Sequence, residues 1–512
     1  MNIISLEGIE SYTFGEQEVR LDEEVLERVR KSFGFLSEFS ENTIIYGINT
    51  GFGPMAQYRI EADDLHYLQY NLIRSHSSGI GKVLDESYAR GVVLARLYSL
   101  SQGNSGISLP VLEKLQQFLN HRIVPEIFEH GGVGASGDLV QLSHLALNLI
   151  GEGYVYQDGN RLEARGVLEK HGIEPLKLSL RDGLGLINGT SCMTGIGAVN
   201  LIFARRLLQW SIAASSIINE VVCSFDDSFS EELNAVKKHT GQKKVAQAMR
   251  DFLGGSRLLR KRDDLYRDAN ELKRKEFKKK IQEYYSVRCV PQILGPVYDT
   301  IEAAVKVVED EFNSTNDNPV VDMESGNVFH GGNFHGDYIS LEMDKLKLVL
   351  TKLTMLAERQ LNFLLNNKLN GKFAPFLNAG TLGLNFGFQG MQFTATSTTA
   401  ENQMLSNPMY VHSIPNNNDN QDIVSMGTNS ALIARTVLDN AFQVMAIHMM
   451  AVCQAIDLLE EEERPLLSPN TQRIYSGIRE HAGFVREDSV PSGTIRQVCD
   501  FLRSTNTEQL IS

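Results

Sequence analysis

The placement of proline is the feature of this 512-residue chain that most restricts its fold. Thirteen prolines are present, yet none lies between Pro175 and Pro291 or between Pro319 and Pro375. Because proline breaks the interior of a helix, these two gaps permit helices longer than average. In residues 341–365, apolar side chains recur at spacings of three and four, which is the stripe of an amphipathic helix. The sequence therefore predicts long helices in both gaps.

Strand patterns are few by comparison. Helical periodicity recurs in three further segments, residues 193–222, 295–312 and 430–459. The clearest alternating patterns are short and cover residues 154–157 and 327–330. We therefore expect a mostly α fold built around a bundle of long helices. Residues 1–190 form the expected N-terminal region, and residues 191–512 form the bundle core and C-terminal helices of one continuous unit.

Composition excludes several classes of partner. The formal net charge of −14 is the opposite of the basic excess of a nucleic-acid-binding protein, and it argues against adhesion to anionic membranes. The basic run in residues 255–280 is interleaved with acids and predicts a solvated helical face. Five scattered cysteines have no metal-ligand spacing, so we expect free thiols and no metal. The first residues lack the basic start and apolar run of a signal peptide, which predicts a cytoplasmic protein.

Glycine gathers in four segments that also carry Asn, Tyr, His or Phe: residues 46–54, 131–138, 186–195 and 329–337. Glycine-dense segments beside helix starts are places where the backbone turns sharply or approaches a ligand. Four ordinary helix connections are the alternative explanation. The shared polar and aromatic content favours one common site.

The segment Gly134-Ala135-Ser136-Gly137-Asp138 can build an electrophile from its own backbone. A backbone amide nitrogen attacks the carbonyl two residues earlier and closes a five-membered ring, which requires the small side chains that Ala135 and Gly137 supply. Loss of water, including the Ser136 hydroxyl, leaves a methylene conjugated to the ring. Asp138 is expected to cap the helix that follows, which places the new group at the positive end of that helix. A plain turn is the alternative for the tetrapeptide taken alone.

Residues 131–153, GGVGASGDLVQLSHLALNLIGEG, resemble the signature of the aromatic amino acid ammonia-lyase family. The resemblance extends from about residue 8 to about residue 460, with separate motifs in the same order. It implies a mostly α, long-helix fold of the fumarase/aspartase-like type. It also implies a homotetramer whose active sites are assembled from several subunits. The electrophile would be 4-methylidene-imidazol-5-one (MIO), formed from Ala135-Ser136-Gly137 with no external cofactor.

Such an enzyme removes a β-hydrogen of low acidity, so it needs a general base. Tyr46, in the segment YGINTGFG, matches the family's catalytic tyrosine and is the expected base. A free tyrosine has a pKa of about 10 and is a poor base at neutral pH. Backbone donors or a positive charge must therefore stabilise the phenolate. A tyrosine that only packs against its loop is the alternative.

The segment QEYYSVRC carries three further matches to the family. Arg288 matches the arginine that binds the substrate carboxylate, which suits its two-pronged guanidinium group. Gln282 and Tyr285 match residues beside the prosthetic group. Their spacing of three from one another and from Arg288 predicts one side of a short helical turn, with Tyr284 facing elsewhere.

Other matches complete the expected site. Asn188, in LINGTS, matches the asparagine that hydrogen-bonds the electrophile's carbonyl and the substrate. Phe334, in GGNFHG, matches an aromatic wall near the methylene. Asn313, in EFNSTNDNP, resembles an element near the substrate carboxylate, with a structural cap as the alternative. Glu401 is expected to link helices.

Two positions opposite the electrophile are expected to choose the amino acid. Ser75-His76 is shared with histidine lyases, whereas phenylalanine lyases tend to carry Phe-Leu there. A histidine at the far end of the pocket can hydrogen-bond a phenol or an imidazole, and phenylalanine would leave it unpaired at a cost of roughly 1–3 kcal/mol. Gln421 stands where histidine lyases place a glutamate that serves the cationic imidazole, and a neutral amide suits a neutral ring. A satisfied core histidine is the alternative for His76.

Together these residues predict a tyrosine ammonia-lyase, which forms trans-p-coumarate and ammonia. Related tyrosine 2,3-aminomutases carry a glutamate directly after the GxG of the base loop, where this chain has Pro54. Histidine ammonia-lyase, which forms urocanate, and tyrosine 2,3-aminomutase are the alternatives. A non-enzyme scaffold is disfavoured because Tyr46, Ser136, Asn188 and Arg288 are all present. An aromatic amino acid is the only small-molecule partner that we expect.

Overall fold

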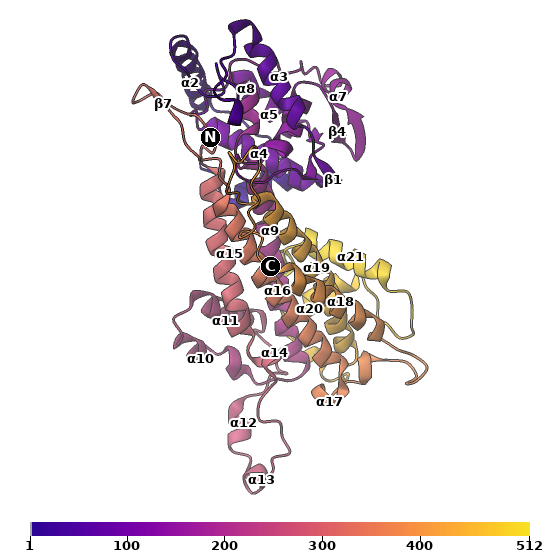
Figure 1. The fold of residues 1–512 in the computed structure, drawn as a ribbon. Coiled ribbons are helices and arrows are strands. Elements are labelled where there is room, and N and C mark those ends of the chain that lie inside the picture. The colour runs from indigo at the N-terminus through magenta and orange to yellow at the C-terminus, as the bar shows by residue number, and fades with distance from the viewer. Residues whose placement is uncertain (1–2, 512) are drawn as a thin grey trace. The chain divides into compact units, whose positions relative to one another are not determined.

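The computed structural model describes residues 3–511 and is mostly helical (Figure 1). The chain divides into two compact units, each composed of several stretches of sequence. Unit 1 comprises Met1–Ile202, Ala304–Asp344 and Pro408–Ala434, and unit 2 comprises Phe203–Ala303, Lys345–Asn407 and Arg435–Ser512. Unit 1 thus contains the whole expected N-terminal region, residues 1–190, together with two later segments that the sequence had assigned to the bundle.

Unit 1 combines short and medium helices with all the strands of the described residues. Its helices are α1 (Leu6–Phe14), α2 (Glu23–Ser40), η1 (Gly53–Met55), η2 (Ala62–Asp64), α3 (Leu65–His76), α4 (Glu86–Ser101), α5 (Leu109–Asn120), α6 (Leu139–Leu149), α7 (Ala164–Lys170) and α8 (Asp182–Ile187). Its strands are β1 (Ile80–Val83), β2 (Val124–Pro125), β3 (Phe128–His130), β4 (Tyr154–Gln157), β5 (Asn160–Glu163), β6 (Val320–Asp322) and β7 (Asn327–Phe329).

Four long helices contribute residues to both units: α9 (Ser191–Val221), α15 (Val290–Phe312), α16 (Asp337–Leu365) and α19 (Gly427–Asp457). The remaining helices belong to unit 2: η3 (Asp226–Phe229), α10 (Glu231–Ala235), α11 (Thr240–Phe252), α12 (Arg262–Tyr266), α13 (Ala269–Leu272), α14 (Tyr285–Arg288), α17 (Asn367–Asn370), η4 (Pro375–Leu377), α18 (Gln389–Leu405), η5 (Arg464–Leu466), α20 (Pro469–Arg479), α21 (Ser492–Ser504) and α22 (Thr507–Ile511).

The four long helices confirm the periodicity in the sequence, and only one boundary differs by more than four residues. Helix α15 begins at Val290 and includes Pro296, whereas the sequence predicted its start at residue 295. Proline at this position leaves one helical carbonyl without its usual donor. The helix continues because its first turns are packed tightly: a Cβ on Gly295 would lie 2.6 Å from the backbone nitrogen of Gln242.

The strands form three small antiparallel sheets, ordered β1-β3, β2-β4-β5 and β6-β7. Both predicted strands are confirmed, as β4 and β7. In the largest sheet Val155 of β4 pairs with Leu162 of β5. The sheets are too short to form a core, so the helices form it.

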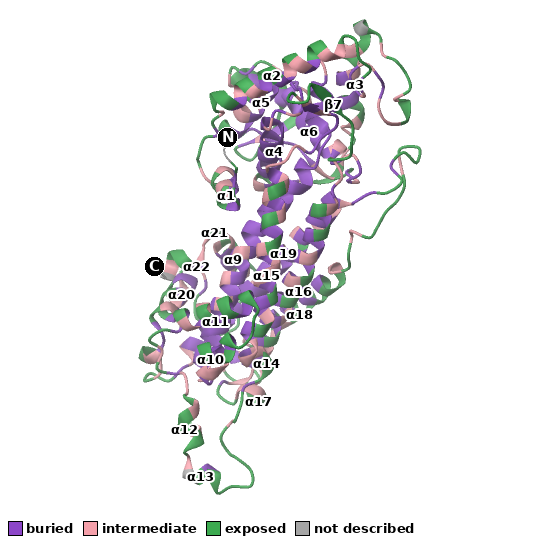
Figure 2. Cartoon of the chain, turned by 90° about the vertical axis from the view of Figure 1, so that its left-hand side faces the viewer, coloured by how far each residue is buried: buried purple, intermediate pink, exposed green. Residues whose placement is uncertain are grey.

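Helix α4 is buried along most of its length: every residue from Tyr88 to Ser101 is buried (Figure 2). Its Arg90 donates hydrogen bonds to the carbonyl oxygens of Tyr12, Thr13 and Leu119, and it thereby ties α1 and α5 to α4. These charge-assisted bonds satisfy a guanidinium that would otherwise be costly to bury.

Helices α9 and α19 are long and apolar enough to cross a membrane by length and composition. However, 83% of the apolar stretch of each is buried within the protein. A membrane-spanning helix would expose such a stretch to lipid, so these are core helices, as in a soluble protein. All five cysteines are free, as expected.

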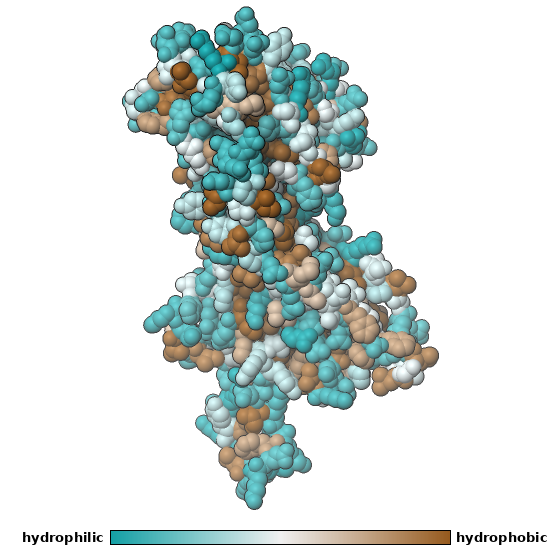
Figure 3. Space-filling view, viewed as in Figure 1, coloured by the Kyte–Doolittle hydropathy of each residue, from teal (hydrophilic) through white to brown (hydrophobic). Residues whose placement is uncertain are grey.

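The basic run at residues 255–280 does not form the expected continuous helical face. It contains only the short helices α12 and α13, and its charges pair with nearby acids, as in Lys279 with Asp268 at 2.6 Å. The alternating charges of this segment fit the pattern of a helical face. In the structure, however, α13 begins directly after Asp268 and ends at Leu272, and the residues that follow are not helical. Teal and brown side chains are mixed over this segment in Figure 3. Leu272 and Phe277 are exposed.

Candidate active site

The tripeptide Ala135-Ser136-Gly137 lies in unit 1, in a tight bend just before α6. Gly134 and Gly137 both have left-handed backbone angles, with φ of +73° and +72°. A Cβ on Gly137 would lie 2.0 Å from the carbonyl oxygen of Gly189, so no other residue fits there. The same oxygen accepts a hydrogen bond of 2.8 Å from the backbone N–H of Asp138. The bend is therefore held close to the Gly189 backbone.

Asn188 lies directly after α8 and is buried against the tripeptide. Its Nδ2 donates a 3.0 Å hydrogen bond to the carbonyl oxygen of Ser136, and its Oδ1 accepts one of 2.8 Å from the backbone N–H of Asn318. Because Asn318 supplies a donor, the orientation of the Asn188 amide is determined. The predicted contact between Asn188 and the tripeptide carbonyl is present.

Gln421 lies on the tripeptide itself rather than across the pocket from it. Its Nε2 donates a 2.8 Å hydrogen bond to the hydroxyl oxygen of Ser136. The side chain is almost fully buried. The expectation that Gln421 stands opposite the electrophile is therefore wrong. Spacing along the chain placed Gln421 in the pocket but could not indicate which wall it occupies.

Tyr46 lies in the loop before η1 and lines the same cavity as Ser136. Its hydroxyl oxygen accepts a 2.9 Å hydrogen bond from the backbone N–H of Gly53. The ring meets that of Phe52 edge to face, with centroids 6.2 Å apart. A backbone donor at the phenol oxygen stabilises negative charge there, which is what a tyrosine base requires.

Ser75 and His76 form the last turn of α3. The Nδ1 of His76 lies 2.9 Å from the carbonyl oxygen of Leu72 and 3.0 Å from the Ser75 hydroxyl. A carbonyl oxygen can only accept, so Nδ1 carries the proton in a neutral imidazole. The Nε2 of His76 is then an acceptor.

These side chains share one cavity of about 630 Å³ within unit 1. Tyr46, Ser75, His76, Ser136, Asn188, Phe334 and Gln421 all line it, as does Pro54. This volume is in the range of small-molecule sites. The structure thus brings together most of the residues that the sequence assigned to the site.

Sequence reasoning missed thirteen lining residues: Phe52, Gly53, Met55, Ala56, Gln57, Leu68, Asn71, Leu72, Leu139, Leu184, Asn318, Asn417 and Asn420. Three of these were detectable. Leu68, Asn71 and Leu72 precede Ser75 and His76 at helical spacings, so one face of α3 had to present them together. The others depend on how loops fold against the tripeptide.

A second cavity of about 360 Å³ adjoins the tripeptide. Ser136, His76 and Gln421 line both cavities, and backbone around Gly131 and Gly132 lines the second alone. Ser136 and Gln421 therefore border open space on two sides.

Asp138 follows the tripeptide and is fully buried. It occupies the N-cap position of α6, as predicted, but its side chain makes no cap bond there. Instead it accepts hydrogen bonds from the backbone N–H of Met193, at 2.8 Å, and from the Thr428 hydroxyl. Met193 belongs to the first turn of α9, so the carboxylate satisfies the start of a different helix. Burial raises the pKa of Asp138 to about 6, although these donors act in the opposite direction.

Asn313 does not line the cavity. At the end of α15 its side-chain oxygen accepts from the backbone N–H of Ile4, and its Nδ2 donates to the carbonyl oxygens of Ile4 and Glu309. The substrate-binding role of Asn313 stays a prediction that these contacts do not support. They match the structural cap that the sequence left as the alternative.

Gln282, Tyr285 and Arg288 belong to unit 2. Helix α14 contains only Tyr285–Arg288, so Gln282 lies outside the helical turn in which it was expected. The Nε of Arg288 donates to the carbonyl oxygen of Glu283 at 2.9 Å, and its guanidinium lies 4.7 Å from the centroid of the Tyr285 ring. Tyr285 is 70% exposed. The substrate and prosthetic-group roles of these three residues stay predictions.

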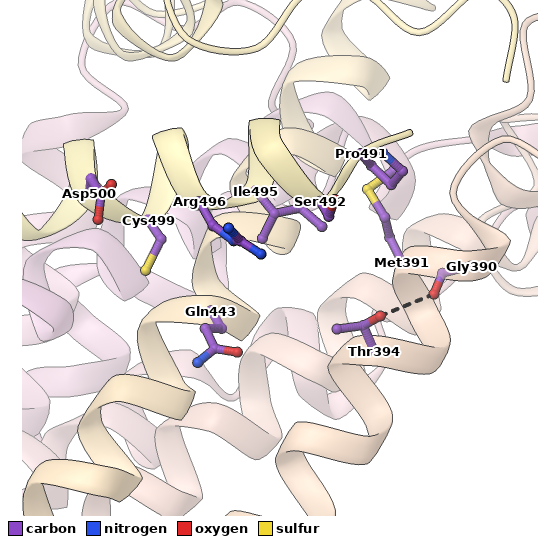
Figure 4. Close-up of a pocket in the computed structure, with 10 residues that line it drawn as sticks. All are labelled: Gly390, Met391, Thr394, Gln443, Pro491, Ser492, Ile495, Arg496, Cys499 and Asp500. Atoms are coloured by element: carbon purple, nitrogen blue, oxygen red, sulfur yellow. Dashed lines mark hydrogen bonds between the residues drawn. The ribbon is translucent and has the colours of Figure 1, made fainter. Parts of the chain in front are cut away.

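Unit 2 also has a cavity of about 630 Å³, between α18, α19 and α21 (Figure 4). None of the predicted site residues lines it. Burial raises the pKa of its Cys499 to about 11, so this thiol is not a nucleophile at neutral pH. Glu401, on α18, accepts a 2.8 Å hydrogen bond from Asn440 on α19 and links these two helices, as predicted.

The fold and the site define a helical enzyme with a glycine-rich bend, an asparagine and a tyrosine around one pocket. Comparison with known proteins supports this description. The family model described as aromatic amino acid lyase matches residues 4–480. A MIO-dependent tyrosine 2,3-aminomutase of Streptomyces globisporus is 40% identical over 490 residues, which cover 94% of this chain and 89% of the relative.

Two further relatives are named for different activities. A tyrosine ammonia-lyase of Cupriavidus metallidurans is 38% identical and covers 90% of this chain and 87% of its own. A histidine ammonia-lyase of Caldanaerobacter subterraneus is 35% identical, and the match covers 100% of this chain and 97% of the relative. The crystal structure of a tyrosine aminomutase from Streptomyces globisporus superposes with a TM-score of 0.96 at 37% identity, covering 100% of this chain and 97% of that one.

The chain belongs to the aromatic amino acid lyase family. It is a carbon–nitrogen lyase with the long-helix fold of that family.

Proposed function

We propose that this protein is a tyrosine ammonia-lyase, which converts L-tyrosine to trans-p-coumarate and ammonia. The observation that carries the proposal is the contact between His76 Nδ1 and the carbonyl oxygen of Leu72. Nδ1 donates to this oxygen at 2.9 Å, so the Nε2 of His76 is an acceptor on the wall of the cavity. The hydroxyl of tyrosine donates to such an acceptor, whereas phenylalanine would leave it unpaired.

Gln421 supports the same choice. It places a neutral amide where histidine lyases carry a glutamate. A protonated imidazole would therefore lack the carboxylate that offsets its charge in a low-dielectric pocket. Ser75 lies beside His76, with its hydroxyl 3.0 Å from Nδ1, and helps to hold the ring.

The residues around the bend fit a methylidene-imidazolone formed from Ala135-Ser136-Gly137. Gly137 has no Cβ, and one would lie 2.0 Å from the Gly189 oxygen, so only this residue allows the bend to stay closed. Asn188 donates a 3.0 Å hydrogen bond to the carbonyl oxygen of Ser136. Such a donor would stabilise negative charge that develops on this oxygen. The group, when present, supplies the electrophile that turns the amino group of the substrate into a leaving group.

The remaining residues bind, orient and deprotonate the substrate. Tyr46 removes the β-proton, with the Gly53 N–H holding its phenol oxygen. Phe334 forms an aromatic wall of the cavity. Arg288 binds the substrate carboxylate, and Gln282 and Tyr285 act beside the prosthetic group. These three residues belong to unit 2.

A homotetramer with shared sites is the assembly that we propose. Large apolar side chains of unit 2 are exposed in the single chain, among them Leu272 at 68%, Tyr285 at 70% and Phe393 at 65%. Exposed apolar groups of this kind mark interfaces. The enzyme is proposed to act in the cytoplasm.

Tyrosine 2,3-aminomutase is the second candidate, since a relative of that name is 40% identical. Pro54 argues against it. This residue lies within η1, lines the same cavity as Tyr46, and occupies the position where the aminomutases carry a glutamate.

One assay distinguishes the candidates. The purified protein is incubated separately with L-tyrosine, L-phenylalanine and L-histidine, and the products are separated by chromatography with ultraviolet detection. Coumarate from tyrosine as the main product supports the proposal. Urocanate from histidine without coumarate would assign a histidine lyase, and β-tyrosine in excess of coumarate would assign the aminomutase.

A further inference from the structure

The Ser136 hydroxyl must leave if the bend is to become an electrophile, and one side chain contacts it. The Nε2 of Gln421 donates a 2.8 Å hydrogen bond to Ser136 Oγ. Within residues 3–511, no other hydrogen bond reaches that oxygen. The donor is therefore in contact with the atom that has to depart.

Gln421 is held in place by its own turn. Its backbone N–H donates to the carbonyl oxygen of Asn416 at 3.3 Å, and the N–H of Asn416 donates back at 3.2 Å. Residues 417–419 between them all have left-handed backbone angles, with φ from +53° to +57°. The side chain itself is only 9% exposed. Such a closed turn pre-positions the amide, which a flexible loop would not do.

Open space is available for the leaving group. Ser136 and Gln421 border the main cavity of about 630 Å³ and the second cavity of about 360 Å³. A water released at Ser136 therefore enters open space directly.

We propose that Gln421 is a catalytic residue for the loss of the Ser136 hydroxyl, a step that completes the electrophile before any substrate is bound. The inference rests on the proposed function, because it concerns the same prosthetic group. It gives Gln421 a task that precedes the choice of substrate.

The step removes one water. The Cα proton of Ser136 passes to solvent, and its electron pair forms the Cα–Cβ double bond. The Cβ–Oγ bond breaks with its electron pair on oxygen, and the resulting hydroxide takes a proton from solvent. Negative charge grows on Oγ as this bond breaks, and the Gln421 N–H stabilises that charge. Removal of one such donor from an oxyanion site slows a reaction on the order of a hundredfold or more.

Intact-mass spectrometry of the full chain tests the step without substrate. The wild-type chain should be lighter than its sequence mass by two waters, one from ring closure and one from Ser136. Gln421→Leu, purified soon after synthesis, should be one water heavier than the wild type and should approach it on the order of a hundredfold more slowly. Asp422→Leu is the matched control, because this neighbour is exposed. Its mass should equal that of the wild type.

The outcomes separate this inference from the proposed function. A wild-type chain at its full sequence mass would overturn the proposed function. A wild type lighter by two waters, together with a Gln421→Leu chain equally light at the first time point, would overturn the role of Gln421 alone. A folded Gln421→Leu chain at its full sequence mass would overturn it too, because the variant would then have failed at ring closure. Circular dichroism checks that each variant is folded.

Gln421→Glu tests the direction of the hydrogen bond and has nearly the same size. A protonated glutamic acid donates to Oγ, whereas the ionised form cannot, and burial raises the pKa of a carboxyl group. The incompletely dehydrated variant is transferred to buffers between about pH 5 and about pH 8, and its mass is followed. Water loss should speed up as the pH falls, against the trend of base-assisted removal of the Cα proton. A rate that rises with pH would contradict a donor role.

Discussion

The phenol oxygen of Tyr46 lies 2.9 Å from the backbone nitrogen of Gly53 and accepts its hydrogen bond. The donor is itself held in place. Gly53 has a left-handed φ of +51°, and a Cβ on it would lie 2.9 Å from Nδ2 of Asn417. The position of the proposed base thus depends on a backbone donor whose left-handed angle favours glycine.

Tyr46→Phe should retain the electrophile and lose turnover. The variant keeps the ring and its edge contact with Phe52 but has no oxygen to take the β-proton. General-base catalysis contributes about 10²–10⁴-fold, so kcat should fall by that order while the intact mass stays equal to that of the wild type. Tyr58→Phe is the control, since Tyr58 is in the same loop but 68% exposed. Undiminished turnover in Tyr46→Phe would remove the base role.

His76→Phe should shift the preference from tyrosine toward phenylalanine. The change removes the acceptor at Nε2 and leaves an apolar wall that suits an unsubstituted ring. The ratio of kcat/KM for tyrosine to that for phenylalanine should fall about 10- to 100-fold, since an unpaired polar group costs roughly 1–3 kcal/mol. His66→Phe, at an exposed position of the same helix, should leave the ratio unchanged. An unchanged ratio in His76→Phe would show that another group recognises the phenol hydroxyl of the substrate.

Much of the fold could be predicted because its signals are local. The segments of α9, α16 and α19 contain no proline and carry apolar stripes, and both signals can be seen within each segment alone. The prediction of a helical face over residues 255–280 was wrong. Alternating charges fit the pattern of a helix, but a charge pattern alone provides no tertiary contact that would stabilise one. Helix α15 starts earlier than expected, and the residue before its Pro296, Gly295, packs closely against Gln242, a tertiary contact that the local pattern does not contain.

The sequence could predict which residues belong to the site, but not which of their atoms are in contact. Motifs placed Tyr46, Ser136 and Asn188 in one pocket, and the structure agrees. Which atoms meet depends on contacts between segments far apart in the chain, such as the 285 residues that separate Ser136 from Gln421. For the same reason, the residue type of Asn313 suggested a ligand contact, although its amide is occupied by Ile4 and Glu309.

Gly137→Ala should prevent formation of the electrophile. The new methyl would lie 2.0 Å from the Gly189 oxygen, so the bend has to open and the ring atoms separate. The variant should keep its full sequence mass, whereas the wild type should be lighter by two waters. Gly172→Ala separates crowding from backbone strain, because Gly172 has a similar φ of +66° and open space around it. That control should lose only about 1 kcal/mol of stability and still lose both waters. Water loss in Gly137→Ala equal to the wild type would contradict the packing argument.

Asp138 should make the stability of the chain fall as the pH rises through the acidic range. Burial raises the pKa of its carboxyl from 3.8 to about 6, so the folded state binds this proton more tightly than the unfolded state. The resulting stabilisation is fully present below the unfolded pKa and is lost as the pH rises through the folded one. At 1.36 kcal/mol per pKa unit, it amounts to about 3 kcal/mol.

Asp138→Asn, which carries no charge, isolates this contribution. Urea unfolding followed by circular dichroism is measured for both chains between about pH 4 and about pH 7. The free energy of unfolding of the variant minus that of the wild type should increase by about 2.4 kcal/mol across this interval, mostly below about pH 6. Asp422→Asn, an exposed control, should give a flat difference. A flat difference for Asp138→Asn would mean that the donors from Met193 and Thr428, rather than burial, control this carboxylate, because they favour its ionised form.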